Sequence, residues 1–188
     1  MQESPKKNPI VGAGLWFWIG LIGIAGILFL GLRSLTVYIG PEERGVVVSP
    51  YQSAGLRQDL LGAGLHILYP GERAYIYDIG RQAYILSKQD AVQAITLDEQ
   101  VVSVEVTVNY AIDPDRIINL HITWQNRYED GIVQPLSRGM TQEIFSHHTK
   151  NEIYFKRSQV EYALFEALKA EFDENYLILI HLTIDAIH

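Results

Sequence analysis

The N-terminal apolar run of this chain limits its possible folds more than any other feature of the sequence. No residue from Ile10 to Leu32 is charged or strongly polar. At about 1.5 Å per residue, a helix over this run is about 34 Å long, against a hydrocarbon core of about 30 Å. Because a backbone in lipid must satisfy its own hydrogen bonds, a lone spanning segment has to be helical. The sequence therefore predicts a short tail over residues 1–9 and a transmembrane helix over residues 10–32.

Anchoring residues flank the predicted helix. Trp16 and Trp18 lie where one membrane interface is expected, Tyr38 lies near the other, and Arg33 can extend toward the second headgroup layer. A cleaved signal peptide is the alternative, but the run is longer than a typical signal-peptide core and no Ala-x-Ala site follows it. The lysines of the tail slightly favour a cytoplasmic N-terminus, with the remaining domain on the outer side. We expect a single-pass membrane protein in contact with membrane lipid.

Length and composition limit the rest of the chain to one domain of a particular kind. Of 188 residues, about 150 remain beyond the apolar run, close to the usual domain size. The formal net charge of −7 argues against nucleic acid as a partner. Cysteine is absent, which excludes disulfides, thiolate nucleophiles and cysteine-based zinc sites.

Short apolar stretches with period-two alternation predict β-strands after a linker over residues 33–43. The longest is Val102–Ile112, in which valines occupy one face and polar residues the other. The last stretch, Leu177–Ile187, also alternates, and we expect Ile178, Ile180, Leu182, Ile184 and Ala186 to share one face and the strand to pair with Val102–Ile112. Three earlier strands are expected to form antiparallel hairpins: Arg44–Ser49, Leu65–Tyr69 and Ala74–Ile79.

Helix patterns dominate between the predicted strands Val102–Ile112 and Leu177–Ile187. Asp113 is expected to cap a short helix that begins at Pro114, and a longer helix is expected over Tyr128–Phe145. Two capping boxes are predicted, at Thr149 with Glu152 and at Ser158 with Glu161. The second precedes apolar residues at helical spacing, namely Val160, Ala163, Leu164, Ala167, Leu168 and Phe172. Residues 44–188 therefore predict an α+β domain of antiparallel strands packed with helices.

The order of several short motifs resembles the SPFH or band 7 superfamily, which includes stomatin, prohibitin, flotillin and HflK/HflC-like proteins. The resemblance covers Tyr38–His188. Its motifs are Gly40-Pro41-Glu42-Glu43-Arg44-Gly45-Val46-Val47, Gly62-Ala63-Gly64-Leu65-His66-Ile67-Leu68-Tyr69-Pro70, Asp78, Arg81, Thr96-Leu97-Asp98, Asp113-Pro114, Gln134-Pro135, Arg138, Glu152-Ile153-Tyr154 and Arg157.

Three departures from the family pattern accompany the resemblance. Asn175-Tyr176 stands where relatives often have a glycine, and Arg138 is followed by Gly139-Met140-Thr141 where relatives often have more arginine. Relatives also continue into a long coiled-coil helix, whereas this sequence ends at His188. Either the natural chain is longer, which we favour, or the assembly mode differs.

The candidate chemical groups are better explained by structure than by catalysis. His147 and His148 point about 100° apart on a helix, and no third metal ligand has a recognisable spacing. His66 has no nucleophile motif to serve, and Asp98 is expected in a turn. A hydrolase of the kind found beside some stomatins would lack its nucleophile here. The sequence therefore predicts no enzyme, no catalytic residue, no cofactor and no metal.

The resemblance implies a membrane-anchored oligomeric scaffold that organises a membrane patch and regulates a client membrane protein or membrane protease. The alternative is a non-catalytic accessory subunit bound one-to-one to a larger membrane enzyme complex. Possible membrane-interface residues are Leu65, Ile67, Leu68 and Tyr69, for which simple core packing is the competing interpretation.

Self-association is expected to use polar side chains that the core does not need. Glu105 and Thr107 lie on the wet face of the long strand, and Glu166 lies on the predicted helix after Ser158. These three residues form the predicted assembly surface.

Overall fold

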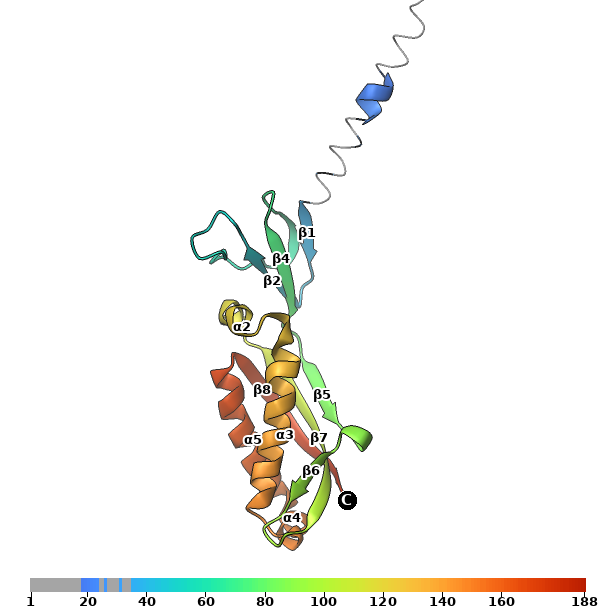
Figure 1. Cartoon of the computed structure of the whole chain (residues 1–188), viewed down its shortest axis with the longest axis vertical. Helices are drawn as coiled ribbons and strands as arrows, with labels where there is room; N and C mark the ends of the chain where they lie inside the picture. Colours follow the sequence, from blue (N-terminus) through green and yellow to red (C-terminus); the bar gives the residue numbers. More distant parts are fainter. Residues whose placement is uncertain (1–17, 24–25, 27–30, 32–34) are drawn as a thin grey trace, which may run out of the picture.

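The computed structural model describes residues 18–23, 26, 31 and 35–188. Within these ranges no helix is long and apolar enough to cross a membrane. Residues 18–23 are helical and exposed, but most of the predicted transmembrane helix, with Trp16 and Arg33, lies outside the described residues. From residue 35 onward the chain forms two stacked lobes (Figure 1). We call residues 35–79 the proximal lobe, because they follow the N-terminal segment, and residues 80–188 the distal lobe.

The distal lobe is a two-layer arrangement of antiparallel strands and helices (Figure 1). The central strand β7 pairs along one edge with β5 and β6 in succession, and along its other edge with β8. Helices α3 and α5 cover one face of this sheet, while the other face is open (Figure 1). The bounds are β5 Gln82–Leu86, β6 Val92–Ile95, β7 Val101–Ile112, β8 Leu177–Ile187, α3 Gln134–Ser146, α4 Lys150–Phe155 and α5 Arg157–Glu174.

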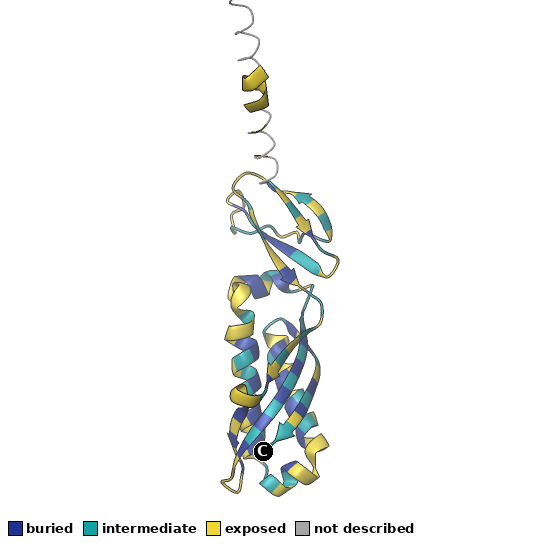
Figure 2. Cartoon of the chain, turned by 90° about the vertical axis from the view of Figure 1, so that its right-hand side faces the viewer, coloured by how far each residue is buried: buried dark blue, intermediate teal, exposed yellow. Residues whose placement is uncertain are grey.

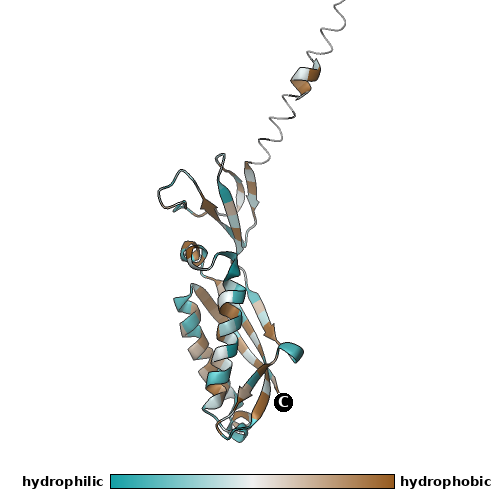
Figure 3. Ribbon diagram, viewed as in Figure 1, coloured by the Kyte–Doolittle hydropathy of each residue, from teal (hydrophilic) through white to brown (hydrophobic). Residues whose placement is uncertain are grey.

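Alternation along β7 explains why the sheet buries only one face. Its even-numbered valines, Val102 to Val108, are buried against the helices, while Ser103 to Asn109 on the other face are only half-buried. The apolar residues of α5 recur every four positions, and Val160, Leu164, Leu168 and Phe172 are all buried. Figure 3 shows brown, apolar segments on the strands beneath these helices. The predicted α+β class, the long strand and its pairing with the last strand are confirmed.

The proximal lobe pairs alternate strands instead of consecutive ones. Strand β1 (Thr36–Ile39) pairs with β3 (Gly64–Ile67), and β2 (Glu43–Val48) pairs with β4 (Arg73–Asp78). The expected hairpins are therefore wrong, because the long loop after β2 forms bridges back to β2 before β3 begins. Strand β1 also lies inside the segment expected to be a linker. Residues of both strand pairs enclose a small core of Ile39, Val47, Leu61 and Leu68.

Helix α2 (Ile117–Thr123) belongs to the distal lobe and lies where this lobe meets the proximal lobe (Figure 1). It begins later than predicted. Asp113 does not cap it: its carboxylate accepts hydrogen bonds from the Asp115 amide and the Arg116 guanidinium. Pro114 therefore lies in a turn, and Arg116 is the N-cap residue. A 3-10 turn (Gln125–Arg127) and a π-helical turn (Glu129–Val133) then lead into α3.

One of the two predicted capping boxes is confirmed and the other is wrong. At α4, the Thr149 hydroxyl accepts from the Glu152 amide while the Glu152 carboxylate accepts from the Thr149 amide. At α5 the helix begins at Arg157, one residue before Ser158. Glu161 instead accepts a hydrogen bond from the Ile184 amide of β8 at 2.9 Å. The Glu161 carboxylate therefore connects α5 to β8 and does not cap the helix.

The face expected for β8 is wrong for part of the strand because of two β-bulges. Tyr110 is paired with Leu179 and Asn109 with His181, so Ile180 is an extra residue. Beyond this bulge Leu182 and Ile184 are buried as predicted, but before it Leu177 and Leu179 are the buried residues and Ile178 is exposed. At the second bulge Asp185 is an extra residue, so Ile187 and not Ala186 is paired with buried Val104.

Candidate functional site

The proximal lobe carries an apolar face that is open to solvent. Tyr38 of β1 lies opposite Leu65 of β3, and Ile67 lies two residues further along β3 on the same side. These three side chains are 68%, 70% and 74% exposed, respectively. Exposed residues recur along the strands of this lobe in Figure 2. Neighbouring apolar side chains left uncovered in this way mark a surface for lipid or for another protein.

Of the four predicted membrane-interface residues, three belong to this apolar face and one does not. Tyr69 follows Leu65 and Ile67 in the alternation and is exposed as they are. Leu68 points the other way, is only 8% exposed and belongs to the small core of the lobe. The competing interpretation, core packing, therefore holds for Leu68 alone.

Strand β1, which carries Tyr38 of the apolar face, directly follows the N-terminal segment (Figure 1). The Leu68 amide donates to the carbonyl of Leu35 at 2.7 Å, and Thr36 is paired with Ile67. The end of β3 is thus fixed beside the residues that follow the predicted membrane helix. A short distance along the backbone separates the apolar face from that helix.

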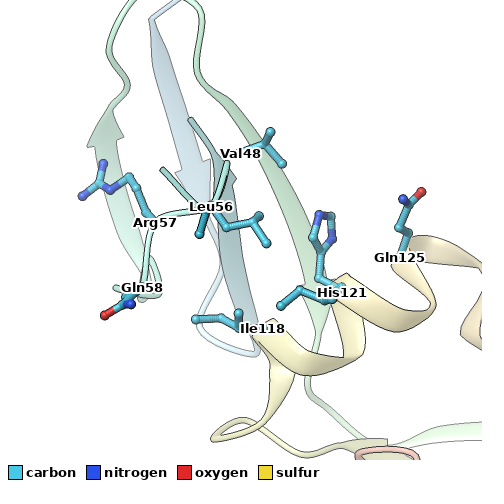
Figure 4. A pocket seen from close by; sticks show the side chains of 9 residues that line it. Val48, Leu56, Arg57, Gln58, Ile118, His121 and Gln125 are labelled. Carbon is cyan, nitrogen blue, oxygen red and sulfur yellow. The ribbon is translucent and has the colours of Figure 1, made fainter. Parts of the chain in front are cut away.

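A pocket of about 450 Å³ lies at the junction of the two lobes. Figure 4 shows Ile118 and His121 rising from α2 toward Val48 and Leu56 of the proximal lobe. The guanidinium of Arg57, which also lines the pocket, points away from His121 (Figure 4). The pocket wall is mostly aliphatic, which suits apolar contact better than chemistry.

One buried hydrogen bond connects the lobes at this junction. The Tyr77 hydroxyl lies 2.6 Å from Nδ1 of His121, and the ring centroid of Tyr75 lies 4.8 Å from that of His121. Burial raises the pKa of Tyr77 to about 12 and lowers the pKa of His121. Both groups are therefore neutral at pH 7, as expected for a structural contact.

The predicted assembly residues lie on opposite faces of the distal lobe. Glu105 and Thr107 lie on the open face of the sheet, where Glu105 accepts from the Lys88 amide at 3.0 Å and Thr107 donates to Asp185 at 2.6 Å. Glu166 is exposed on α5, in the helical layer. The structure therefore separates one predicted surface into two.

The candidate catalytic groups have structural partners. Nε2 of His66 lies 2.7 Å from the Gly62 carbonyl, and Nδ1 of His147 lies 2.9 Å from the Glu143 carbonyl. Asp98 accepts from the Thr96 hydroxyl and the Lys150 amide, and these bonds lower its pKa. In the described part of the chain, no group of three or more His, Cys, Asp or Glu residues could hold a metal ion.

Sequence reasoning missed the contribution of α2 to the junction. Ile118 and His121 lie three residues apart, so they share a helix face, but nothing in the sequence indicates which partner that face meets.

Comparison with known protein families gives a match over most of the chain. The sequence model of the family described as SPFH domain / Band 7 family matches residues 37–188. No curated protein matches the chain. The matched range includes both lobes, the apolar face and the junction pocket.

Proposed function

Because the chain belongs to the SPFH domain / Band 7 family, we propose that it is a membrane-anchored, non-catalytic scaffold. Its N-terminal apolar run crosses the membrane as a single helix, and its proximal lobe rests in the interfacial layer. Copies associate laterally through the distal lobes, organise a membrane patch and regulate a client membrane protein or membrane protease. The N-terminus is cytoplasmic and both lobes are on the outer side.

The exposed apolar face of the proximal lobe is the observation that carries this proposal. Tyr38, Leu65 and Ile67 would each be costly to leave in water, since burying such a side chain gains about 1.5–3 kcal/mol. Ile67 is paired with Thr36, and the next residue, Leu68, is bonded to Leu35, so a membrane helix over residues 10–32 would end only a few residues before this face. Aromatic and aliphatic side chains are stable together at that depth.

Self-association is supported by the two separate faces of the distal lobe. The open sheet face around Thr107 and the helical face around Glu166 are different surfaces of one molecule. If the first face contacts the second on a neighbour, the contact is heterologous and can repeat around a ring or along a row. Each contact can be weak, because confinement to a membrane raises the effective concentration.

A fluorescent label tests immersion of the apolar face directly. Residues 1–188 contain no cysteine, so Ile67→Cys creates a unique labelling site in this sequence. A matched control is Ile85→Cys in the distal lobe, since Ile85 is also an exposed isoleucine, at 58%. Both variants of the full chain would be labelled with an environment-sensitive nitrobenzoxadiazole dye and reconstituted in vesicles.

We expect the label at Ile67 to emit at shorter wavelength and to be shielded from aqueous iodide, while the label at Ile85 remains quenchable. Equal quenching at both sites would contradict interfacial immersion. Extraction of the unlabelled chain from membranes by carbonate would contradict anchoring itself. A monomeric, reconstituted chain with one bound partner protein would instead support the accessory-subunit alternative.

A further inference from the structure

A second pocket of the proximal lobe, of about 490 Å³, lies between the loop after β2 and the turn from β3 to β4. Its lining includes two tyrosines, Tyr51 and Tyr69, and three charged residues, Arg57, Asp59 and Glu72. The volume is in the range of small-molecule sites. The function proposed above makes no use of this pocket.

The pocket walls are held together by hydrogen bonds between the two loops. The Tyr51 hydroxyl donates to the carbonyl of Pro70 at 2.5 Å. The Tyr69 amide donates to Oε2 of Glu72 at 2.9 Å, and the Glu72 side chain is only 2% exposed. The Tyr51 side chain, the Tyr69 backbone and the buried Glu72 carboxylate are therefore fixed before any ligand arrives, which reduces the entropic cost of binding.

The charges in the pocket favour a cationic group. Arg57 is held by Asp59 through Nε at 3.1 Å and Nη2 at 2.5 Å, and its Nη1 lies 3.7 Å from Glu72. One guanidinium thus faces two carboxylates, and the hydrogen bond from Arg57 holds the pKa of Asp59 below its usual value. A lone anion would meet a net negative charge. An ammonium group would meet carboxylates together with tyrosine rings, which attract cations through their π faces.

Arg57 also limits which cation fits. A bare metal ion would have only two carboxylates, with a guanidinium between them, and this is a poor ligand set. A ligand that carries a phosphate next to its ammonium group can place the phosphate near Arg57 and the ammonium near the carboxylates. Guanidinium groups are well suited to phosphate. The charge pattern of the pocket therefore matches a zwitterion.

The location of the pocket points to a lipid as the source of this zwitterion. Tyr69 is two residues beyond Ile67 of the apolar face, and the neighbouring Leu68 amide is bonded to Leu35. If the proximal lobe rests on the membrane, the pocket lies at the depth of the headgroups. We propose that this pocket binds the ammonium-phosphate headgroup of a zwitterionic phospholipid, of the ethanolamine or choline class. This location rests on the proposed membrane anchoring, whereas the headgroup chemistry does not.

Binding of free headgroups tests the chemistry without a membrane. The full chain in a maltoside detergent would be titrated with glycerophosphoethanolamine, glycerophosphocholine, anionic glycerophosphoglycerol and butylammonium, using saturation-transfer NMR. We expect the zwitterions to bind and glycerophosphoglycerol to bind much more weakly. Asp59→Asn and Tyr69→Leu should each weaken zwitterion binding by about threefold to tenfold, from the loss of one charge or cation–π contact. Tyr162→Leu, on exposed α5, is the matched control and should bind as the natural chain does.

Equal binding of glycerophosphoglycerol, or no effect of Asp59→Asn and Tyr69→Leu, would overturn the inference. Butylammonium binding as tightly as the zwitterions would also overturn it, in favour of a lysine side chain of a partner protein. Asp59→Asn and Tyr69→Leu both alter exposed residues, and thermal melting would verify that each variant is folded.

Lipid retention tests the source of the zwitterion. The chain would be reconstituted with equal ethanolamine and glycerol phospholipids, re-extracted in maltoside, and its retained lipids measured by mass spectrometry. Enrichment of the ethanolamine lipid that is lost in Asp59→Asn supports a lipid headgroup. Headgroup binding without enrichment overturns the lipid source and leaves a free zwitterion as the ligand. Failure of anchoring appears separately, as carbonate extraction, and leaves the titration to decide the headgroup chemistry.

Discussion

Removal of one hydroxyl at the lobe junction should make the stability of the protein less dependent on pH. Burial favours neutral His121, and we assign its proton to Nε2, so that Nδ1 accepts from the Tyr77 hydroxyl at 2.6 Å. In Tyr77→Phe the buried Nδ1 loses its partner. An unsatisfied buried acceptor costs about 1–3 kcal/mol, so we expect this loss of unfolding free energy at pH 7.5. The melting temperature should fall by about 2–4 °C per kcal/mol.

The sign of the pH effect follows from the lowered pKa of His121. Unfolded histidine titrates near pH 6.5, so below about that pH the unfolded state binds more protons and the natural chain loses stability. A protonated ring no longer accepts at Nδ1, so the cost of Tyr77→Phe should shrink as the pH falls through the folded pKa. The other ionisable group that contacts the ring is Tyr75 on β4. Arg57 lines the same pocket, but its guanidinium points away from His121 (Figure 4).

Thermal unfolding of the full chain in maltoside, followed by circular dichroism between pH 5 and pH 8, measures this prediction. Tyr75→Phe is the matched control: it keeps the ring that contacts His121 and should change stability by less than about 0.5 kcal/mol. A cost of Tyr77→Phe that is the same at pH 5 and pH 8 would refute the assigned tautomer. No cost at pH 8 would refute the structural role of the hydrogen bond.

Three other perturbations probe the core, a helix end and the assembly. Phe172→Ala removes a fully buried ring that meets Tyr110 edge-on, and should lower the unfolding free energy by about 3–5 kcal/mol in denaturant titration. Thr149→Ala removes the α4 cap and should cost about 1 kcal/mol, whereas Thr149→Ser should restore most of it in the same titration. Glu166→Lys, on the exposed helical face, should reduce the mass of assemblies in light scattering while shifting stability by no more than about 0.5 kcal/mol; unchanged mass would exclude this face from the contact.

Sequence patterns predicted the distal lobe well because its elements are long. Twelve residues of β7 alternate without interruption, and the apolar residues of α5 keep one helical face over eighteen residues. The buried residues of both elements can therefore be predicted from the spacing of their apolar residues. The bulge at Ile180 escapes this reasoning, because it depends on how β8 meets β7 and not on the residues of β8 alone.

The proximal lobe was harder to predict because its strands are short. Four residues of β1 and four of β3 do not specify a partner by periodicity. Their pairing depends on the path of the loop after β2. In this loop Leu61 forms a β-bridge with Gly45 of β2. The exposed apolar face could be predicted as a candidate from Leu65 and Ile67, but the burial of Leu68 required the position of the second strand pair.

At one departure from the family pattern, Asn175-Tyr176 in place of a glycine, the structure shows backbone strain. Tyr176, in the turn directly before β8, has a φ of 66°, a left-handed conformation that favours glycine. Its carbonyl accepts from the Asp113 amide at 3.1 Å, and Arg116 lies over its ring, 5.9 Å from the centroid. The tight turn is therefore kept, and contacts of the side chain offset the strain that glycine would avoid.

The outer edge of β8 bears on how copies of this chain can associate. An exposed strand edge invites pairing with another strand, but here side chains of the helical layer occupy part of it. Glu161 accepts from the Ile184 amide, Arg157 donates to the carbonyls of Ile184 and Asp185, and Tyr154 donates to the carbonyl of Ile187. A strand added at this end would have to displace a carboxylate, a guanidinium and a phenol. Association through the faces of the distal lobe requires no such displacement, which favours the proposed lateral contact through the faces around Thr107 and Glu166 over strand addition.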